Sequence, residues 1–127
     1  MREDKLSVLS MRFAVEIVRL TQRLQQQQRE YIISDQLGRS GPSIGANIRE
    51  AQYGHSKADF IAKLQIALKE ANESGFWLDL LWETDYLSDE EHKRLSNACG
   101  ELRVILIHSI NTAKENLKKK PKTQSQP

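Results

Sequence analysis

The sequence predicts an all-α fold: an antiparallel up-down four-helix bundle followed by a disordered basic C-terminal tail. Four segments repeat apolar residues every three or four positions, which is the spacing of one helix face. No segment of useful length alternates as a strand does, and the connections between the four segments are short. A length of 127 residues suits one domain. We place this domain at residues 1–117 and the tail at residues 118–127.

The first two segments each carry one apolar seam. In the first, six apolar residues follow one another in steps of three or four: Leu6, Leu9, Phe13, Ile17, Leu20 and Leu24. The pattern breaks near Arg29. The second segment begins at Ser34 or Asp35, both favourable N-cap residues, and its apolar stripe contains Leu37, Ile44 and Ile48. Pro42 lies inside this stripe, so we expect a kink or a loosened turn, not a break.

Capping boxes mark the starts of the other two helices. Ser56 with Asp59 opens the third helix, and Ser88 with Glu91 opens the fourth. Their apolar stripes contain Leu64, Leu68, Ala71 and Leu78, and then Leu95, Cys99, Leu102 and Leu106. Residues 118–127 (KKKPKTQSQP) are basic, polar and interrupted by two prolines, which predicts a disordered tail.

Composition excludes several classes of protein. A single cysteine, Cys99, rules out an internal disulfide framework and a cysteine-built zinc site. No apolar run approaches the roughly 20 residues that a membrane span needs, and the N-terminus lacks an apolar signal-peptide core. We therefore expect a cytoplasmic protein with no membrane partner. The net charge of +2 comes largely from the last seventeen residues, so overall charge does not indicate nucleic-acid binding.

Two helices carry more apolar surface than one seam requires. On the first helix, a second stripe is rotated by about 160° from the first, at 100° per residue. This second stripe consists of Val8, Met11, Val15 and Val18. On the third helix, six of the seven residues 76–82 are apolar, among them Phe76 and Trp77. An aligned second stripe usually marks a buried contact. We expect self-association through these residues; the alternative is a wider core within one chain.

The second helix and its flanks resemble a known family. Residues 36–51 (QLGRSGPSIGANIREA) resemble the signature Q-L-x-R-S-x-x-S-I-x-x-N-I-x-E of the bacterial four-helix-bundle proteins, also called 23S rRNA intervening-sequence proteins. The similarity continues through residues 56–60, 64–73, 77–78 and 86–87. Many members carry proline where Gly45 stands and glycine where Ala51 stands. These departures concern the geometry of the helix.

The resemblance implies a cytoplasmic bacterial protein that forms a ring-like homopentamer of four-helix bundles without enzymatic activity. Some members are encoded within inserts in 23S rRNA genes. Distant relatives serve as accessory subunits of the reverse transcriptase in diversity-generating retroelements, where a basic pentameric surface meets nucleic acid. The interpretation that follows is a non-enzymatic homo-oligomer that binds RNA, DNA or a nucleic-acid enzyme. The alternative is a protein–protein adaptor with no nucleic-acid binding.

Polar residues of the family motif border the apolar stripe of the second helix. They are Gln36, Ser40, Ser43, Asn47 and Glu50, with Arg39 beside them. Buried polar groups need hydrogen-bond partners, and we expect Asn72 and Glu73 of the third helix to supply them. The motif would then be an internal network that fixes the register of the helices. The alternative is a ligand or nucleic-acid contact built from Arg39, Ser43 and Asn47.

A basic line follows the first helix between its two apolar stripes. Its residues lie within about 40° of arc. They are Lys5, Arg12, Arg19 and Arg23. Repeated around an oligomer, the line would form a basic ring that can hold a phosphate backbone. The alternative is a solvated face with pairs such as Arg12–Glu16. The tail offers further candidate contacts to RNA or DNA, unless its lysines only add solubility: Lys118, Lys119 and Lys120.

The sequence offers no catalytic or metal-binding constellation. His92 and His108 are sixteen residues apart on the fourth helix, which is roughly 24 Å and too far to share a metal. No Glu-x-x-His pair is present, which disfavours a di-iron bundle site. Cys99 lies on the core face, and the glycines of the second helix do not follow a strand as a phosphate-binding loop would. We therefore expect no enzyme, no cofactor and no metal.

Overall fold

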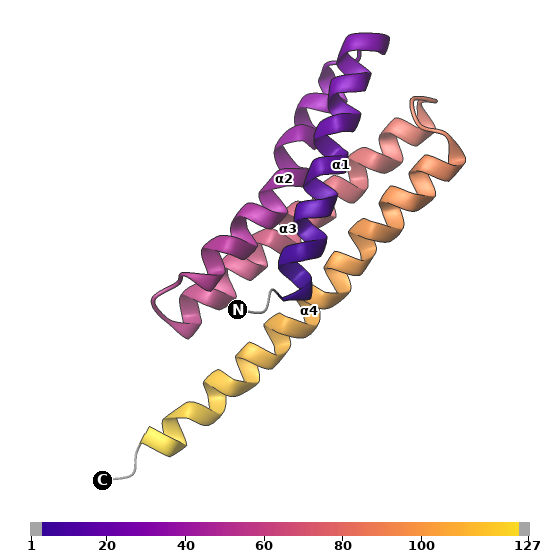
Figure 1. Cartoon of the computed structure of the whole chain (residues 1–127). Helices are drawn as coiled ribbons and strands as arrows, with labels where there is room; N and C mark the ends of the chain where they lie inside the picture. The colour runs from indigo at the N-terminus through magenta and orange to yellow at the C-terminus, as the bar shows by residue number, and fades with distance from the viewer. Residues whose placement is uncertain (1–3, 125–127) are drawn as a thin grey trace.

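The structure is a computed structural model that describes residues 4–124 and the side chains of residues 4–119. This part of the chain folds as four long helices that run alternately up and down, with no strand (Figure 1). The helices are α1 (Lys5–Gln28), α2 (Ile32–Gln52), α3 (Lys57–Glu83) and α4 (Asp89–Gln124). The predicted all-α up-down bundle is confirmed.

The core lies between all four helices, but some pairs of neighbouring helices pack more closely than others. Helix α2 packs along both α1 and α3, and α3 packs along α4, whereas α1 touches α4 more sparsely. Ile17, Leu37, Ile44, Leu78 and Leu102 are completely buried. Each such side chain contributes roughly 1.5–3 kcal/mol relative to an exposed position. These are positions of the apolar stripes that the sequence predicts.

Helices α1 and α2 come closest where α2 has glycine. A Cβ atom on Gly41 would lie 2.8 Å from Cγ2 of Ile17, and one on Gly45 would lie 3.2 Å from Oγ of Ser10. Ile17 therefore packs directly against the backbone of α2. The glycine at 41 is required by this close approach, since any side chain there would push the two helices apart.

The two capping serines act as the sequence predicts. Oγ of Ser56 accepts a hydrogen bond from the backbone amide of Asp59, and Oγ of Ser88 accepts one from the amide of Glu91, each at 3.1 Å. These bonds satisfy amides that have no partner within the helix, and so they set the starts of α3 and α4.

Helix α2 begins earlier than its predicted start at Ser34 or Asp35. Its first residue is Ile32, because the buried carboxylate of Glu30 accepts hydrogen bonds from the amides of Ile33 and Ser34 at 2.9 and 2.7 Å. A carboxylate is also favoured at the positive end of a helix dipole. The start of α2 is therefore capped by an acidic residue from the preceding turn.

Two helices extend past prolines. Helix α2 is continuous across Pro42, as expected. Helix α4 continues past Pro121 and ends at Gln124, so the helical region is longer than the predicted boundary at Leu117. Lysine is a good helix former, and its charge is favourable near a helix C-terminus. Of the predicted tail, the side chains of 120–124 and all of 125–127 lie outside the described residues.

Charged side chains link α1 to α4 where their apolar contact is sparse. The three ion pairs are Lys5–Glu101, Glu16–Arg94 and Arg23–Glu91. The guanidinium of Arg23 donates to both carboxylate oxygens of Glu91, at 2.8 Å each. This hydrogen bonding raises the pKa of Arg23. Bidentate pairs of this kind are the geometrically specific form of ion pair, so they orient α1 relative to α4.

Replacing Gly41 tests the close approach of α1 and α2. Gly41→Ala should lower the midpoint of thermal unfolding, because the new methyl group collides with Ile17 and overpacking costs roughly 1–3 kcal/mol. Gly38→Ala on the same helix is the matched control. Its Cβ would lie 3.7 Å from Thr21, an ordinary contact, so the gain in helix propensity should leave stability unchanged or higher. A midpoint for Gly41→Ala at or above that of the control would contradict the close contact.

Removing the Arg23–Glu91 pair tests the α1–α4 seam. Because these side chains are 39% and 20% exposed, a double-mutant cycle of Arg23→Ala and Glu91→Ala should give a modest coupling energy, about 0.5–1 kcal/mol. The coupling should shrink at high salt, which screens partly exposed charges. Chemical denaturation with urea measures it. Strictly additive effects of the two substitutions would show that the pair does not stabilise the seam.

Candidate assembly and nucleic-acid surfaces

The outer face of α1 exposes an apolar ridge. Met11, Val15 and Val18 are 52%, 41% and 41% exposed, and Val8 at the start of the ridge is half-buried. A shallow groove of about 470 Å³ borders the ridge on the side of α2. The groove is lined by Ser7, Ser10, Met11, Ala14, Pro42, Gly45, Ala46, Arg49 and Glu50. The predicted second stripe of the first helix is thus open to solvent in the isolated subunit.

The two aromatic residues predicted for the interface differ in exposure. Phe76 is 59% exposed on the outside of α3, whereas Trp77 is half-buried and packs against the core. Their rings meet edge to face, with centroids 5.0 Å apart. Only Phe76 therefore offers a large apolar surface to a partner.

Two exposed apolar residues of α4 were not predicted from the sequence. Val104 and Ile107 are 68% and 42% exposed. They lie beside Arg103, which donates to Oδ1 of Asn72 on α3 at 2.7 Å. Both residues fall off the apolar stripe of the fourth helix, and apolar residues outside a stripe are the signal that could have found them.

The polar motif of α2 makes hydrogen bonds within its own helix. Oγ of Ser43 donates to the carbonyl of Arg39 at 2.6 Å, and Nδ2 of Asn47 donates to the carbonyl of Ser43 at 2.9 Å. Gln36 and Arg39 are exposed. Glu50 is exposed too and lies 3.8 Å from Nζ of Lys63 on α3. The expected hydrogen bonds from this motif to Asn72 and Glu73 do not occur among the described residues, because the short side chains reach their own backbone first.

A pair of serines forms the buried polar contact between α2 and α3. Oγ of Ser74 donates to Oγ of Ser40 at 2.9 Å, and the two residues are 0% and 3% exposed. A buried hydroxyl without a partner costs about 1–3 kcal/mol. Ser40, on the polar flank of α2, therefore has its partner on α3 in Ser74 and not in Asn72 or Glu73.

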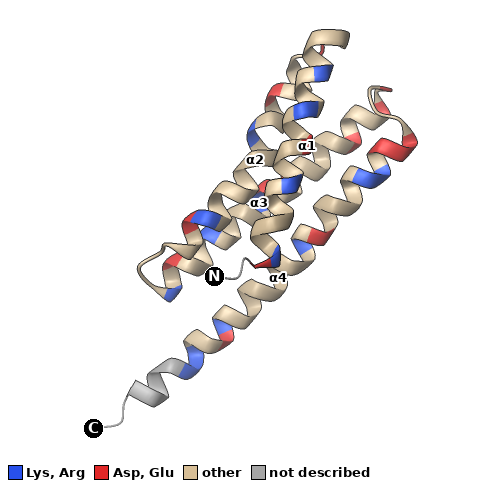
Figure 2. Ribbon diagram, in the orientation of Figure 1, with Lys and Arg blue, Asp and Glu red and all other residues tan. Residues whose placement is uncertain are grey.

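Half of the basic line on α1 is engaged in ion pairs with α4. Lys5 and Arg23 pair with acidic residues of α4. The Arg12–Glu16 pair of the alternative interpretation does not form, because Glu16 pairs with Arg94 on the other helix. Figure 2 shows basic and acidic residues interspersed along α1 and α4. Arg12 and Arg19 are exposed and form no ion pair with the side chains of residues 4–119.

The end of α4 carries a second group of basic residues. Helix α4 continues beyond the α2–α3 connection (Figure 1). Near the end of this helix, Lys118 and Lys119 are exposed, and Lys114 is exposed one turn earlier. The side chain of Lys120 lies outside the described residues. No ion pair neutralises the three described lysines within the described part of the chain.

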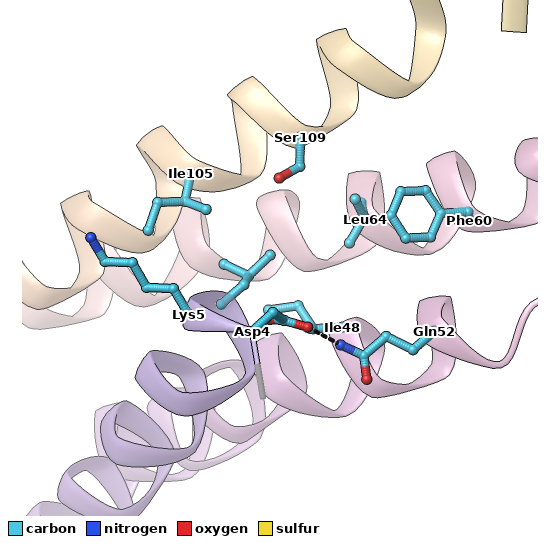
Figure 3. Close-up of a pocket in the computed structure, with 9 residues that line it drawn as sticks. Asp4, Lys5, Ile48, Gln52, Phe60, Leu64, Ile105 and Ser109 are labelled. Carbon is cyan, nitrogen blue, oxygen red and sulfur yellow. Dashed lines mark hydrogen bonds between the residues drawn. The ribbon is translucent and has the colours of Figure 1, made fainter. Parts of the chain in front are cut away.

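A small pocket lies where α1 begins, between the four helices (Figure 3). Its volume is about 240 Å³. Ile48, Leu64 and Ile105 contribute apolar surface from α2, α3 and α4, and Asp4 accepts a 2.6 Å hydrogen bond from Nε2 of Gln52 at the rim. The residues that line the pocket include no histidine and no cysteine.

His92 and Cys99, both on α4, have partners on α3. The thiol of Cys99 donates to the carbonyl of Ala71 at 3.2 Å, and burial raises the pKa of Cys99 to about 11. The thiol is therefore protonated at neutral pH and is a poor nucleophile. The ring of His92 stacks on Trp82 with centroids 4.2 Å apart, and its Nε2 lies 2.8 Å from Oδ1 of Asp79.

Neither a metal site nor a membrane-spanning helix occurs within residues 4–124. Among their described side chains, no three His, Cys, Asp or Glu residues gather closely enough to hold a metal ion. No helix in this range combines the length and the apolar character needed to cross a membrane.

Comparisons with known proteins agree with the resemblance of the motif. The model of a family described as 23S rRNA-intervening sequence protein matches residues 3–108. A crystal structure from Bacteroides thetaiotaomicron, described as a protein with unknown function from the S23 ribosomal protein family, is 48% identical, with a TM-score of 0.82. The alignment covers 83% of this chain and 97% of that chain. No curated protein matches the sequence. The chain belongs to the 23S rRNA-intervening sequence protein family.

Proposed function

We propose that the protein is a non-enzymatic, homo-oligomeric scaffold. The observation that carries this proposal is the apolar ridge of α1, where Met11, Val15 and Val18 are aligned and 41–52% exposed. Burial of apolar surface stabilises an association by about 25 cal/mol per Å². Contiguous exposed patches of this kind mark interaction sites on soluble proteins. The resemblance to ring-like homopentamers implies five subunits.

The chemistry of the reactive side chains supports a non-enzymatic role. The thiol of Cys99 is buried and protonated, and it donates its hydrogen bond to a backbone carbonyl. His92 is held between Trp82 and Asp79 at the α3–α4 connection, away from the pocket at the start of α1. No hydrogen bond among the described residues joins the His92 ring to a serine or cysteine side chain, so the His92–Asp79 pair has no nucleophile attached to it of the kind that nucleophilic catalysis requires.

The double variant Met11→Glu/Val15→Glu should dissociate the assembly into single chains of 14.6 kDa. Two carboxylates on the ridge would have to be desolvated at the interface, which opposes association. The helix content should be unchanged, because both side chains face away from the core of the subunit. Light scattering measures the mass and circular dichroism the helix content.

Ile32→Glu is the matched control for this variant. Ile32 is 81% exposed at the start of α2, away from the ridge, and its replacement should leave the mass of the assembly unchanged. An equal mass for Met11→Glu/Val15→Glu and the unaltered chain would contradict the proposal.

We propose, as a second function, that the assembly binds nucleic acid through the end of α4. This proposal is supported by the exposed lysines Lys114, Lys118 and Lys119 in the last turns of α4. An oligomer would repeat this basic end once per subunit and multiply its contacts with a phosphate backbone. The ion pairs of Lys5 and Arg23 with α4 reduce what the basic line of α1 can offer to such a partner.

Salt dependence tests the nucleic-acid proposal. Binding of single-stranded RNA should weaken with salt, and Lys118→Gln/Lys119→Gln should weaken it further and flatten the slope of log affinity against log salt. The slope should change by about 0.7 for each phosphate that the variant no longer neutralises. Lys93→Gln, an exposed lysine near the start of α4, is the matched control and should bind as the unaltered chain does.

Two outcomes would contradict contact through the end of α4. Loss of binding in Arg12→Gln/Arg19→Gln alone, with the assembly intact, would place the contact on α1. Absence of binding to RNA and DNA at low salt would favour the protein–protein adaptor.

A further inference from the structure

Two glycines of α3 and α4 have no explanation within the subunit. A Cβ atom on Gly75 or on Gly100 would meet nothing within 4 Å, in contrast to the crowded Gly41. Glycine inside a helix is less favourable than alanine by roughly 1 kcal/mol. The subunit alone would therefore be at least as stable with alanine at either position. Glycine at these positions leaves room for something outside the subunit to come close.

Exposed apolar residues lie beside these glycines. Phe76 follows Gly75 on α3, and Val104 lies one turn after Gly100 on α4, with Ile107 three residues further on. Contacts of Asn72 with Arg103 and of Asp79 with His92 align the two helices, so that the segment around Phe76 faces the segment around Gly100. We call this surface the α3/α4 notch; it consists of Gly75, Phe76, Gly100, Val104 and Ile107.

The ridge of α1 and the α3/α4 notch lie on different sides of the subunit. Helix α1 packs on α2 and α4, and α3 also packs on α2 and α4, whereas α1 and α3 are not neighbours in the described part of the chain. The ridge of one chain therefore does not cover its own notch. Both surfaces are apolar, and the ridge carries large side chains where the notch has two glycines.

The charges beside the α1 ridge and beside the α3 side of the notch are complementary. On α1, Val15 is flanked by Arg12 and Arg19, which form no ion pair within the described chain. On α3, Phe76 is flanked by Glu73 and Asp79. The two arginines are separated by roughly 10 Å along their helix and the two acids by roughly 9 Å, at 1.5 Å per residue.

The carboxylates of Glu73 and Asp79 are available to pair with basic residues of another chain. The side chain of Asp79 remains 66% exposed although it contacts His92. Glu73 is half-buried and forms no ion pair with described residues. Burial and the charge of Glu73 together raise the pKa of the neighbouring Glu70, so these two carboxylates repel each other. Arginines brought from another chain would relieve that repulsion.

We infer that the subunits associate head to tail, with the α1 ridge of one copy seated in the α3/α4 notch of the next. This inference rests on the proposed self-association and names the two surfaces that form it. A contact between two different surfaces leaves one ridge and one notch free at the ends of any open chain of subunits. A closed ring satisfies both surfaces of every subunit.

Mixing two complementary variants tests the contact. The ridge variant Met11→Glu/Val15→Glu keeps its notch, and the notch variant Phe76→Glu/Val104→Glu keeps its ridge. Each variant alone should be monomeric with native helix content. An equimolar mixture should form a heterodimer of one copy of each, because only one intact ridge and one intact notch can meet. Sedimentation velocity at concentrations well above those at which the unaltered chain assembles measures the masses.

Charge reversal provides a second test with milder changes. Arg12→Glu/Arg19→Glu should dissociate the assembly, and adding Glu73→Arg/Asp79→Arg in the same chain should restore it. The mixing experiment overturns the inference if the notch variant alone keeps the mass of the unaltered assembly, since α1 would then meet another part of the chain. The inference is also overturned if the mixture remains monomeric while the unaltered chain assembles. An unaltered chain that is itself monomeric would instead refute the proposed self-association.

Discussion

The close approach of α1 to α2 at Gly41 determines how the other faces of α1 are used. Ile17 is pressed against the α2 backbone because a side chain at position 41 would not fit. Once this contact fixes the rotation of α1, the helical period determines the direction of its other residues. Phe13 points into the core, and Met11 and Val15 point outward. The contact that builds the core thus also presents the apolar ridge.

The same rotation turns the basic line of α1 toward α4. Lys5 and Arg23 meet acidic residues there, and Glu16 meets Arg94, so charge compensates for the sparse apolar contact between these two helices. Partly exposed pairs contribute little stability each, but bidentate geometry gives them directional specificity. Part of the basic line that the sequence offers as a nucleic-acid contact thereby joins α1 to α4. Of the basic line, Arg12 and Arg19 remain outside these ion pairs.

Apolar periodicity was sufficient to predict the helices and the core, because burial at Leu37, Ile44 and Leu78 depends on the face of the helix alone. The partners of polar side chains could not be predicted in this way. Asn47 and Ser40 lie on the same predicted flank, yet the amide of Asn47 reaches the carbonyl of Ser43 in its own helix. Ser40 does contact α3, but its partner is Ser74 and not the expected Asn72 or Glu73. Choosing between such bonds requires distances that a sequence pattern does not contain. The cap that Glu30 provides was missed for the same reason.

The central claim is that the isolated subunit is incomplete, because its ridge and its notch are both open. The most direct test is the mass of the unaltered full-length chain in solution, measured by native mass spectrometry across a range of concentrations. We expect one dominant species at an integer multiple of 14.6 kDa, with the multiple equal to the number of subunits in a closed ring. A mass of 14.6 kDa at every concentration would contradict the claim.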